Sequence, residues 1–87
     1  MPEQTFLMVV EGTAESGYCG FFPTLPGCAT AGDTLDEIVI RASEGLSLHL
    51  DGLRADGEPL PEPRPVTAAD LADAEEFAGV VAVTYRP

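Results

Sequence analysis

Two cysteines and the single histidine are the side chains of this sequence best suited to nucleophilic or metal chemistry. Cys19 and Cys28 fit neither a Cys-x-x-Cys motif nor a Cys/His metal-ligand spacing, and no Lys, Arg or His lies near them to favour a thiolate. His49 falls on or beside the apolar stripe of an expected helix, and nothing in the sequence places it next to a nucleophile and an orienting carboxylate. We therefore expect free cysteines packed as small residues, with no catalytic residue, no metal site and no cofactor.

Carboxylates are the other candidates for chemistry. Asp70, Asp73, Glu75 and Glu76 could suggest a hard-cation site, but calcium loops need a turn glycine and a loop spacing, whereas these residues lie on an expected helix. A solvated or partner-facing surface is the favoured interpretation of this group.

The overall charge limits the classes of macromolecule that this protein can bind. The 87 residues contain fifteen Asp/Glu against four Lys/Arg, which gives a net charge of -11 and a pI near 4.1. Such a field repels phosphate backbones and anionic membranes and attracts basic proteins, although it can also serve solubility alone. We expect no direct nucleic-acid binding and no membrane contact. Glu11 and Glu15 around the first turn, and Asp33 and Asp36 at the start of the main helix, are the candidate partner-binding residues.

Three strands are predicted in the first third of the chain. Residues 4–11 are mostly apolar, and their apolar side chains fall on both faces of the expected strand. This pattern is typical of a central strand. Residues 18–22 and 28–32 are two shorter strands separated by Pro23 and Pro26, which cannot donate ladder hydrogen bonds. Short links favour antiparallel neighbours, so these segments predict a meander with 28–32 at its edge.

The strongest helical signal runs over residues 34–56. Thr34 and Glu37 have capping-box spacing, Gly57 supplies a C-terminal stop, and Gly45 in the middle suggests close packing there. The apolar stripe consists of Leu35, Ile38, Val39, Ala42, Leu46, Leu50 and Leu53.

The last third of the chain predicts a stiff connection, a short helix and a final strand. Prolines alternate through residues 59–65, which excludes helix. Residues 67–79 can form a second helix with Thr67 and Asp70 as its cap, and residues 80–86 alternate as a strand. One long helix covers only one face of such a sheet, so we expect the other face to be solvated or to meet a second protein.

Two stretches of this sequence, "FPTLPGCATAGDTLDE" and "DGEPLPEP", together resemble the HicB family, the antitoxin half of HicAB toxin–antitoxin systems, and in particular its N-terminal domain. The matching residues are Gly17, Tyr18, Phe22, Pro23, Leu25, Pro26, Gly27, Cys28, Thr30, Gly32, Asp33, Thr34, Leu35, Glu37, Asp56, Gly57, Glu58, Pro59, Pro61 and Pro63. The valine-rich stretch before the C-terminus also sits where the family has its closing strand.

The resemblance implies an α+β, partial RNase H-like fold of order β-β-β-α-(α)-β, with one long helix on one face of a mixed four-stranded sheet. It implies binding and neutralisation of a small basic HicA-type mRNA interferase by protein–protein contact. Many HicB proteins continue into a DNA-binding domain, and we expect residues 1–87 to be a single HicB-like domain without one. A cytoplasmic, self-associating protein, a homodimer or higher homo-oligomer, is expected.

Two alternatives to the antitoxin remain open at this point. An orphan adaptor could keep the fold and its self-association and bind an unrelated partner. A degenerate RNase H-like nuclease would need carboxylates converging from several elements for two-metal hydrolysis. Glu11 with Glu37 or Glu44 might supply two, but the closing strand supplies none.

Overall fold

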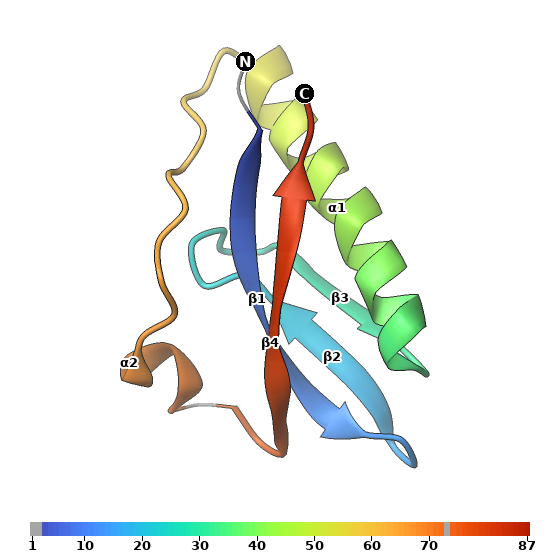
Figure 1. The fold of residues 1–87 in the computed structure, drawn as a ribbon. Coiled ribbons are helices and arrows are strands. Elements are labelled where there is room, and N and C mark those ends of the chain that lie inside the picture. The colour runs from blue at the N-terminus through green and yellow to red at the C-terminus, as the bar shows by residue number, and fades with distance from the viewer. Residues whose placement is uncertain (1–2, 73) are drawn as a thin grey trace.

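The computed structural model describes residues 3–72 and 74–87 and has the expected α+β fold (Figure 1). One long helix packs on one face of a four-stranded sheet, as predicted. The elements in chain order are β1 (Gln4–Thr13), β2 (Gly17–Phe21), β3 (Ala29–Gly32), α1 (Leu35–Ala55), α2 (Ala68–Leu71) and β4 (Phe77–Tyr85).

The sheet has the strand order β3-β2-β1-β4, so β1 is central and β3 lies at an edge, as the sequence predicts. β1 pairs with β2 from Val9↔Phe21 to Thr13↔Gly17, and with β4 from Gln4↔Tyr85 onward. The register with β4 shifts between Val10 and Glu11, which marks a bulge. β1 is therefore central in the sheet, as its two apolar faces predict.

Every strand pair is antiparallel, which corrects the expectation of a mixed sheet. The reason lies in the segment after α1. The helix returns the chain to the end of the sheet where β1 begins, and a strand entered there would run parallel to β1. The extended connection over residues 58–67 instead carries the chain back along the sheet, so that β4 starts beside the end of β1 (Figure 1).

The core lies between α1 and the sheet. It contains Phe6, Met8, Val10, Phe22, Leu25, Cys28, Ile38, Ala42, Leu46, Leu50, Val83 and Tyr85. Full burial of a Leu or Ile side chain contributes about 1.5–3 kcal/mol, so this cluster dominates stability. The loop between β2 and β3 turns inward, because Phe22 and Leu25 are buried and Cys28 N–H donates to the Leu25 carbonyl at 2.9 Å. The proline-rich corner is therefore part of the core.

Both ends of α1 are fixed as the sequence predicts. The Thr34 hydroxyl accepts a hydrogen bond from Glu37 N–H at 3.1 Å, and Gly57 has φ +72 just beyond the Asp56 cap. The Glu37 carboxylate binds Arg41 at 2.8 Å. The helix therefore begins and ends within one residue of the expected bounds.

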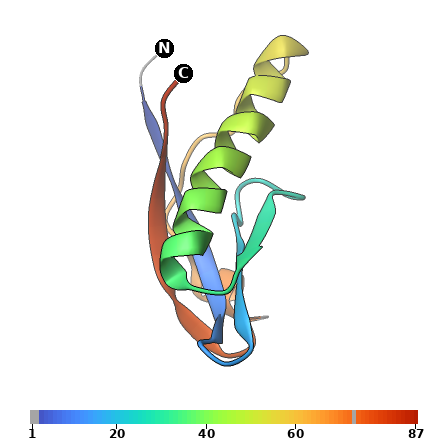
Figure 2. The same cartoon turned by 90° about the vertical axis from the view of Figure 1, so that its right-hand side faces the viewer.

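The connection and α2 lie on the side of the sheet away from α1, which corrects the expectation that this face is left to solvent or a second protein (Figures 1 and 2). Val9 points to this side and is fully buried, while Val66 and Leu71 of the covering segment are partly buried. Leu60, in contrast, packs against the core cluster between α1 and the sheet. The chain therefore covers part of its own second face.

α2 is also shorter than the predicted helix over residues 67–79. Glu76 has φ +52, a left-handed conformation that ends any helix, and Phe77 already begins β4. The helical spacing of Leu71, Ala74 and Phe77 therefore does not reflect a helix face.

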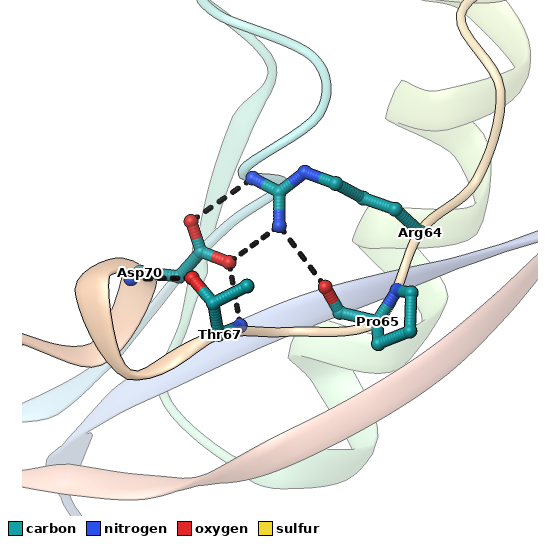
Figure 3. A network of polar contacts seen from close by, with 4 residues as sticks. All are labelled: Arg64, Pro65, Thr67 and Asp70. Atoms are coloured by element: carbon teal, nitrogen blue, oxygen red, sulfur yellow. Dashed lines mark hydrogen bonds and ion pairs between the residues drawn. The ribbon is translucent and has the colours of Figure 1, made fainter.

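Arg64 fastens the connection to α2 (Figure 3). Its guanidinium donates two hydrogen bonds to the Asp70 carboxylate, at 2.7 and 3.0 Å, and one to the Pro65 carbonyl. Asp70 also accepts from Thr67 N–H at 2.8 Å, and Thr67 Oγ1 accepts in return from Asp70 N–H, so the predicted cap is a complete capping box. The Asp70 side chain is only 12% exposed. One carboxylate therefore joins the connection to α2.

This network makes the free energy of unfolding depend on pH. Arg64, and then Thr67 N–H, hold the pKa of the Asp70 carboxyl well below its usual range. A lowered pKa in the folded state stabilises the protein above the ordinary Asp pKa near 4, and that contribution is lost as the pH falls through the lowered value. We predict that Asp70→Asn lowers the urea midpoint at pH 7, and that its difference from the wild type shrinks below about pH 4. Glu62→Gln, at an exposed position, is the control; a difference that stays constant from pH 7 to pH 2 would contradict the prediction.

Gly45 does not have the close neighbour expected from its place in the helix. It is exposed, and a Cβ built on it meets nothing within 4 Å. We predict that Gly45→Ala raises the free energy of unfolding by up to about 1 kcal/mol, the helix-propensity difference, as measured by urea denaturation. Gly32→Ala is the contrasting variant, since its Cβ would lie 3.0 Å from Ile38 N, and overpacking there should cost about 1–3 kcal/mol. Equal changes in the free energy of unfolding for the two variants would contradict the open surroundings of Gly45 and the tight packing of Gly32.

Candidate partner-binding surface

All four arginines are paired with carboxylates of the same chain. Arg41 lies 2.8 Å from Glu37, Arg64 2.7 Å from Asp70, Arg86 3.4 Å from Glu3 and Arg54 4.0 Å from Asp51. Exposed pairs of this kind contribute little to stability, about 0–1 kcal/mol each. Their larger effect is on the surface potential, because they neutralise the positive charge locally and leave the remaining carboxylates uncompensated.

A hollow of about 300 Å³ lies where the β1–β2 turn meets the start of α1. Its lining consists of Ala14, Tyr18, Asp33, Thr34, Leu35 and Asp36, and we call it the acidic hollow. The turn is held by Ser16 N–H donating to Thr13 Oγ1 at 3.0 Å. Gly12 has φ +117, and a Cβ there would lie 2.2 Å from the Gly17 carbonyl oxygen, so glycine is required. A tight turn and a capped helix end thus bring distant residues together.

The acidic hollow suits a cationic side chain. Asp33 and Asp36 supply two carboxylates, and no Lys, Arg or His is present in the lining. Leu35 is 49% exposed, and Tyr18 is half-buried, so apolar surface is available for the stem of an arginine or lysine. The positive end of the helix dipole is offset here by the Thr34 cap and the acidic first turn.

The four predicted partner-binding residues divide into two groups. Asp33 and Asp36 line the acidic hollow, and Glu15 is exposed in the turn beside Ala14. Glu11 is separate from them, because its carboxylate accepts a hydrogen bond from Glu75 N–H at 2.8 Å, where the chain enters β4. The structure therefore brings Asp33 and Asp36 together, leaves Glu15 exposed in the neighbouring turn, and gives Glu11 an internal contact.

Two residues of the acidic hollow were outside the predicted site. The sequence places Leu35 in the buried stripe of the helix, yet Leu35 lies in the first turn and is half-exposed, as is Val39 at 39%. Tyr18 is expected only as a strand residue. The consecutive residues Asp33, Thr34 and Leu35 are the sequence signal that could have indicated Leu35.

One of the two thiols, Cys28, lies near the histidine. Cys28 and His49 line one hollow of about 270 Å³ with Leu48, between α1 and the segment that enters β3. Burial nevertheless raises the pKa of the Cys28 thiol, so a reactive thiolate is disfavoured. Both cysteines are free, as expected, with Cys19 exposed and Cys28 buried. Residues 3–72 and 74–87 contain no group of three His, Cys, Asp or Glu placed to hold a metal ion.

The carboxylates considered for two-metal hydrolysis do not converge. Glu11 binds Glu75 N–H, and Glu37 binds Arg41 on α1. Of the acidic group around α2, Asp70 is bound by Arg64, and Asp73 lies outside the described residues. Within the described ranges, the helices are too short or too polar to cross a lipid bilayer.

The two cysteines should differ in reactivity. We predict that iodoacetamide at pH 8 alkylates Cys19 in the native protein and leaves Cys28 largely unmodified, because the Cys28 thiol is buried and its pKa is raised. Peptide mass spectrometry measures the two sites separately. In urea both should react equally, which provides the control; fast native alkylation of Cys28 would contradict its burial.

Solved structures similar to this chain include HicB antitoxins. The chain is similar to a chain of the HicA3 and HicB3 toxin–antitoxin complex, with 26% identity and a TM-score of 0.67 over 95% of this chain and 96% of the other. It is also similar to the N-terminal domain of Burkholderia pseudomallei antitoxin HicB, with 25% identity and a TM-score of 0.64 over 97% and 98% of the two chains.

Sequence relatives are less informative about activity. An uncharacterized 14.9 kDa protein of Haemophilus phage HP1 is 44% identical over 50 residues, which is 58% of this chain and only 38% of the phage protein. A UPF0150 protein of Synechocystis is 32% identical over 66% of this chain and 72% of its own length. The model of the family described as "HicB_like antitoxin of bacterial toxin-antitoxin system" matches residues 6–85. The chain therefore belongs to the HicB-like antitoxin family.

Proposed function

We propose that this protein neutralises a small basic mRNA interferase of the HicA type by direct protein–protein contact. The observation that carries the proposal is the acidic hollow, which Asp33 and Asp36 line without a cation. Arg41 lines the adjoining hollow with Asp33, but its guanidinium is paired with Glu37 at 2.8 Å. Family membership and the similarity to a chain of a HicA–HicB complex support the same partner class.

Electrostatic attraction would act mainly on the rate at which the two proteins associate. A net charge of -11 attracts a basic protein over long range, and complementary potentials speed association and fix orientation. Burial of apolar surface then holds the complex, and Leu35 at the rim of the hollow offers such surface. Because the partner cleaves mRNA, the complex would form in the cytoplasm, where free thiols are the usual state.

The first experiment tests the partner. The protein is co-expressed with the small basic protein encoded beside it, and growth and copurification are measured. Rescued growth and a stable complex are the expected results. A toxic neighbour that is neither bound nor neutralised would refute the antitoxin role, and the orphan-adaptor alternative would then gain support.

The second experiment tests the surface. We predict that reversing Glu15, Asp33 and Asp36 to Lys weakens toxin binding at least about tenfold at low salt, because like charges then face each other. The variant should also lose most of the salt dependence of Kd, measured by calorimetry. Glu11 stays unchanged because its carboxylate holds Glu75.

A matched control reverses Glu44, Glu58 and Glu62, which are exposed and lie outside the acidic hollow. This variant has the same net charge as the first. Equal loss of affinity in both would mean that overall charge, and not the acidic hollow, attracts the toxin.

A further inference from the structure

The segment on the side of the sheet away from α1 has no polar attachment to the strands. Residues 61–72, which we call the cover, run from the proline-rich connection through α2 on this side (Figures 1 and 2). Among residues 3–72 and 74–87, no hydrogen bond or ion pair links the cover to a strand. Its apolar contact is also limited, because Val66 and Leu71 are only partly buried and no residue of α2 is fully buried.

The chain is fixed on both sides of the cover. Before it, Leu60 packs against the core cluster. After it, the Glu11 carboxylate accepts a hydrogen bond from Glu75 N–H at 2.8 Å, and Gly12 N–H donates to the Glu76 carbonyl at 2.9 Å. A movement of the cover can therefore stop at these points and leave α1 and β4 in place.

The polar contacts of the cover are all internal to it. Arg64 donates to the Asp70 carboxylate at 2.7 and 3.0 Å, and Thr67 N–H donates to the same carboxylate at 2.8 Å. None of these hydrogen bonds requires the sheet. The cover can therefore leave the sheet without breaking them.

Two neighbouring valines of β1 differ in what buries them. Val10 is buried in the core cluster between α1 and the sheet. Val9 points to the opposite side and is fully buried there, outside that cluster. Because the cover is the layer on this side of the sheet, its position decides whether Val9 meets water (Figures 1 and 2).

We propose that the cover opens as a unit while α1 and the sheet stay folded, and that opening exposes the apolar surface of β1 around Val9. Segments with few buried apolar contacts open at a lower free energy than the whole molecule unfolds. The acidic hollow belongs to the β1–β2 turn and α1, so opening leaves it unchanged. The protein therefore has an apolar surface that it displays only part of the time, whether or not a toxin is bound.

The test compares a cysteine beneath the cover with a cysteine in the core. Val9→Cys and Val10→Cys are made separately in a background of Cys19→Ser and Cys28→Ala, and alkylation by iodoacetamide is followed at pH 8. Position 9 should react at least about tenfold faster than position 10, because the cover opens more often than the protein unfolds. Urea should speed the reaction steeply at position 10 and only slightly at position 9, since the urea dependence scales with the surface exposed. Urea midpoints check that each variant folds.

Two further substitutions assign the opening to the cover. Leu71→Ala removes an apolar contact of the cover and should speed alkylation at position 9 at least about threefold. Val83→Ala lowers the stability of the core and should speed alkylation at position 10 alone, because the closed and open forms share that core.

Three results would each overturn the proposal. The first is equal rates with equal urea dependence at positions 9 and 10. The second is a Val83→Ala variant that speeds both positions equally, which would mean that position 9 reacts only through global unfolding. The third is a Leu71→Ala variant that leaves the rate at position 9 unchanged.

Discussion

The packing of the apolar stripe of α1 against one face of the sheet is the constraint on which the other features depend. Ile38, Leu46 and Leu50 pack in one buried cluster with Phe6 and Met8. This packing requires small residues where the layers approach most closely: a Cβ on Gly20 would lie 2.5 Å from Met8 Sδ, and one on Gly32 3.0 Å from Ile38 N. Because α1 is fixed in this way, its C-terminus lies at the far end of the sheet, and the chain must travel back before β4 can form.

Local sequence signals predicted those elements whose ends or faces are marked by residues within the element or next to it. Thr34 and Gly57 mark the ends of α1, and alternation on both faces marks β1 as central. The predictions that failed concern how segments distant in sequence pack together. Nothing local indicates that residues 58–67 run along the side of the sheet away from α1 (Figures 1 and 2), that Gly45 faces open space, or that β4 runs antiparallel to β1. The same limit applies to the site, because the internal contact of Glu11 depends on Glu75, which is remote in sequence.

The surface is divided by charge in a way that composition alone does not reveal. Arginine pairs neutralise the flanks of α1 and the connection, the turn beside Asp33 keeps its negative charge, and β4 is neutral. A protein of this size has little area to assign to separate contacts. Negative charge is therefore concentrated where the β1–β2 turn meets α1, whereas the edge strand β4 carries none.

The pairing of Gln4 with Tyr85 has a consequence for the order of folding. The meander and α1 join neighbours in sequence, so they can form early with small losses of loop entropy, whereas β1 and β4 must close a loop that contains almost the whole chain. During synthesis, one edge of β1 therefore stays unpaired until residues 77–85 have left the ribosome. The central strand of the finished sheet is, for most of that time, an edge strand.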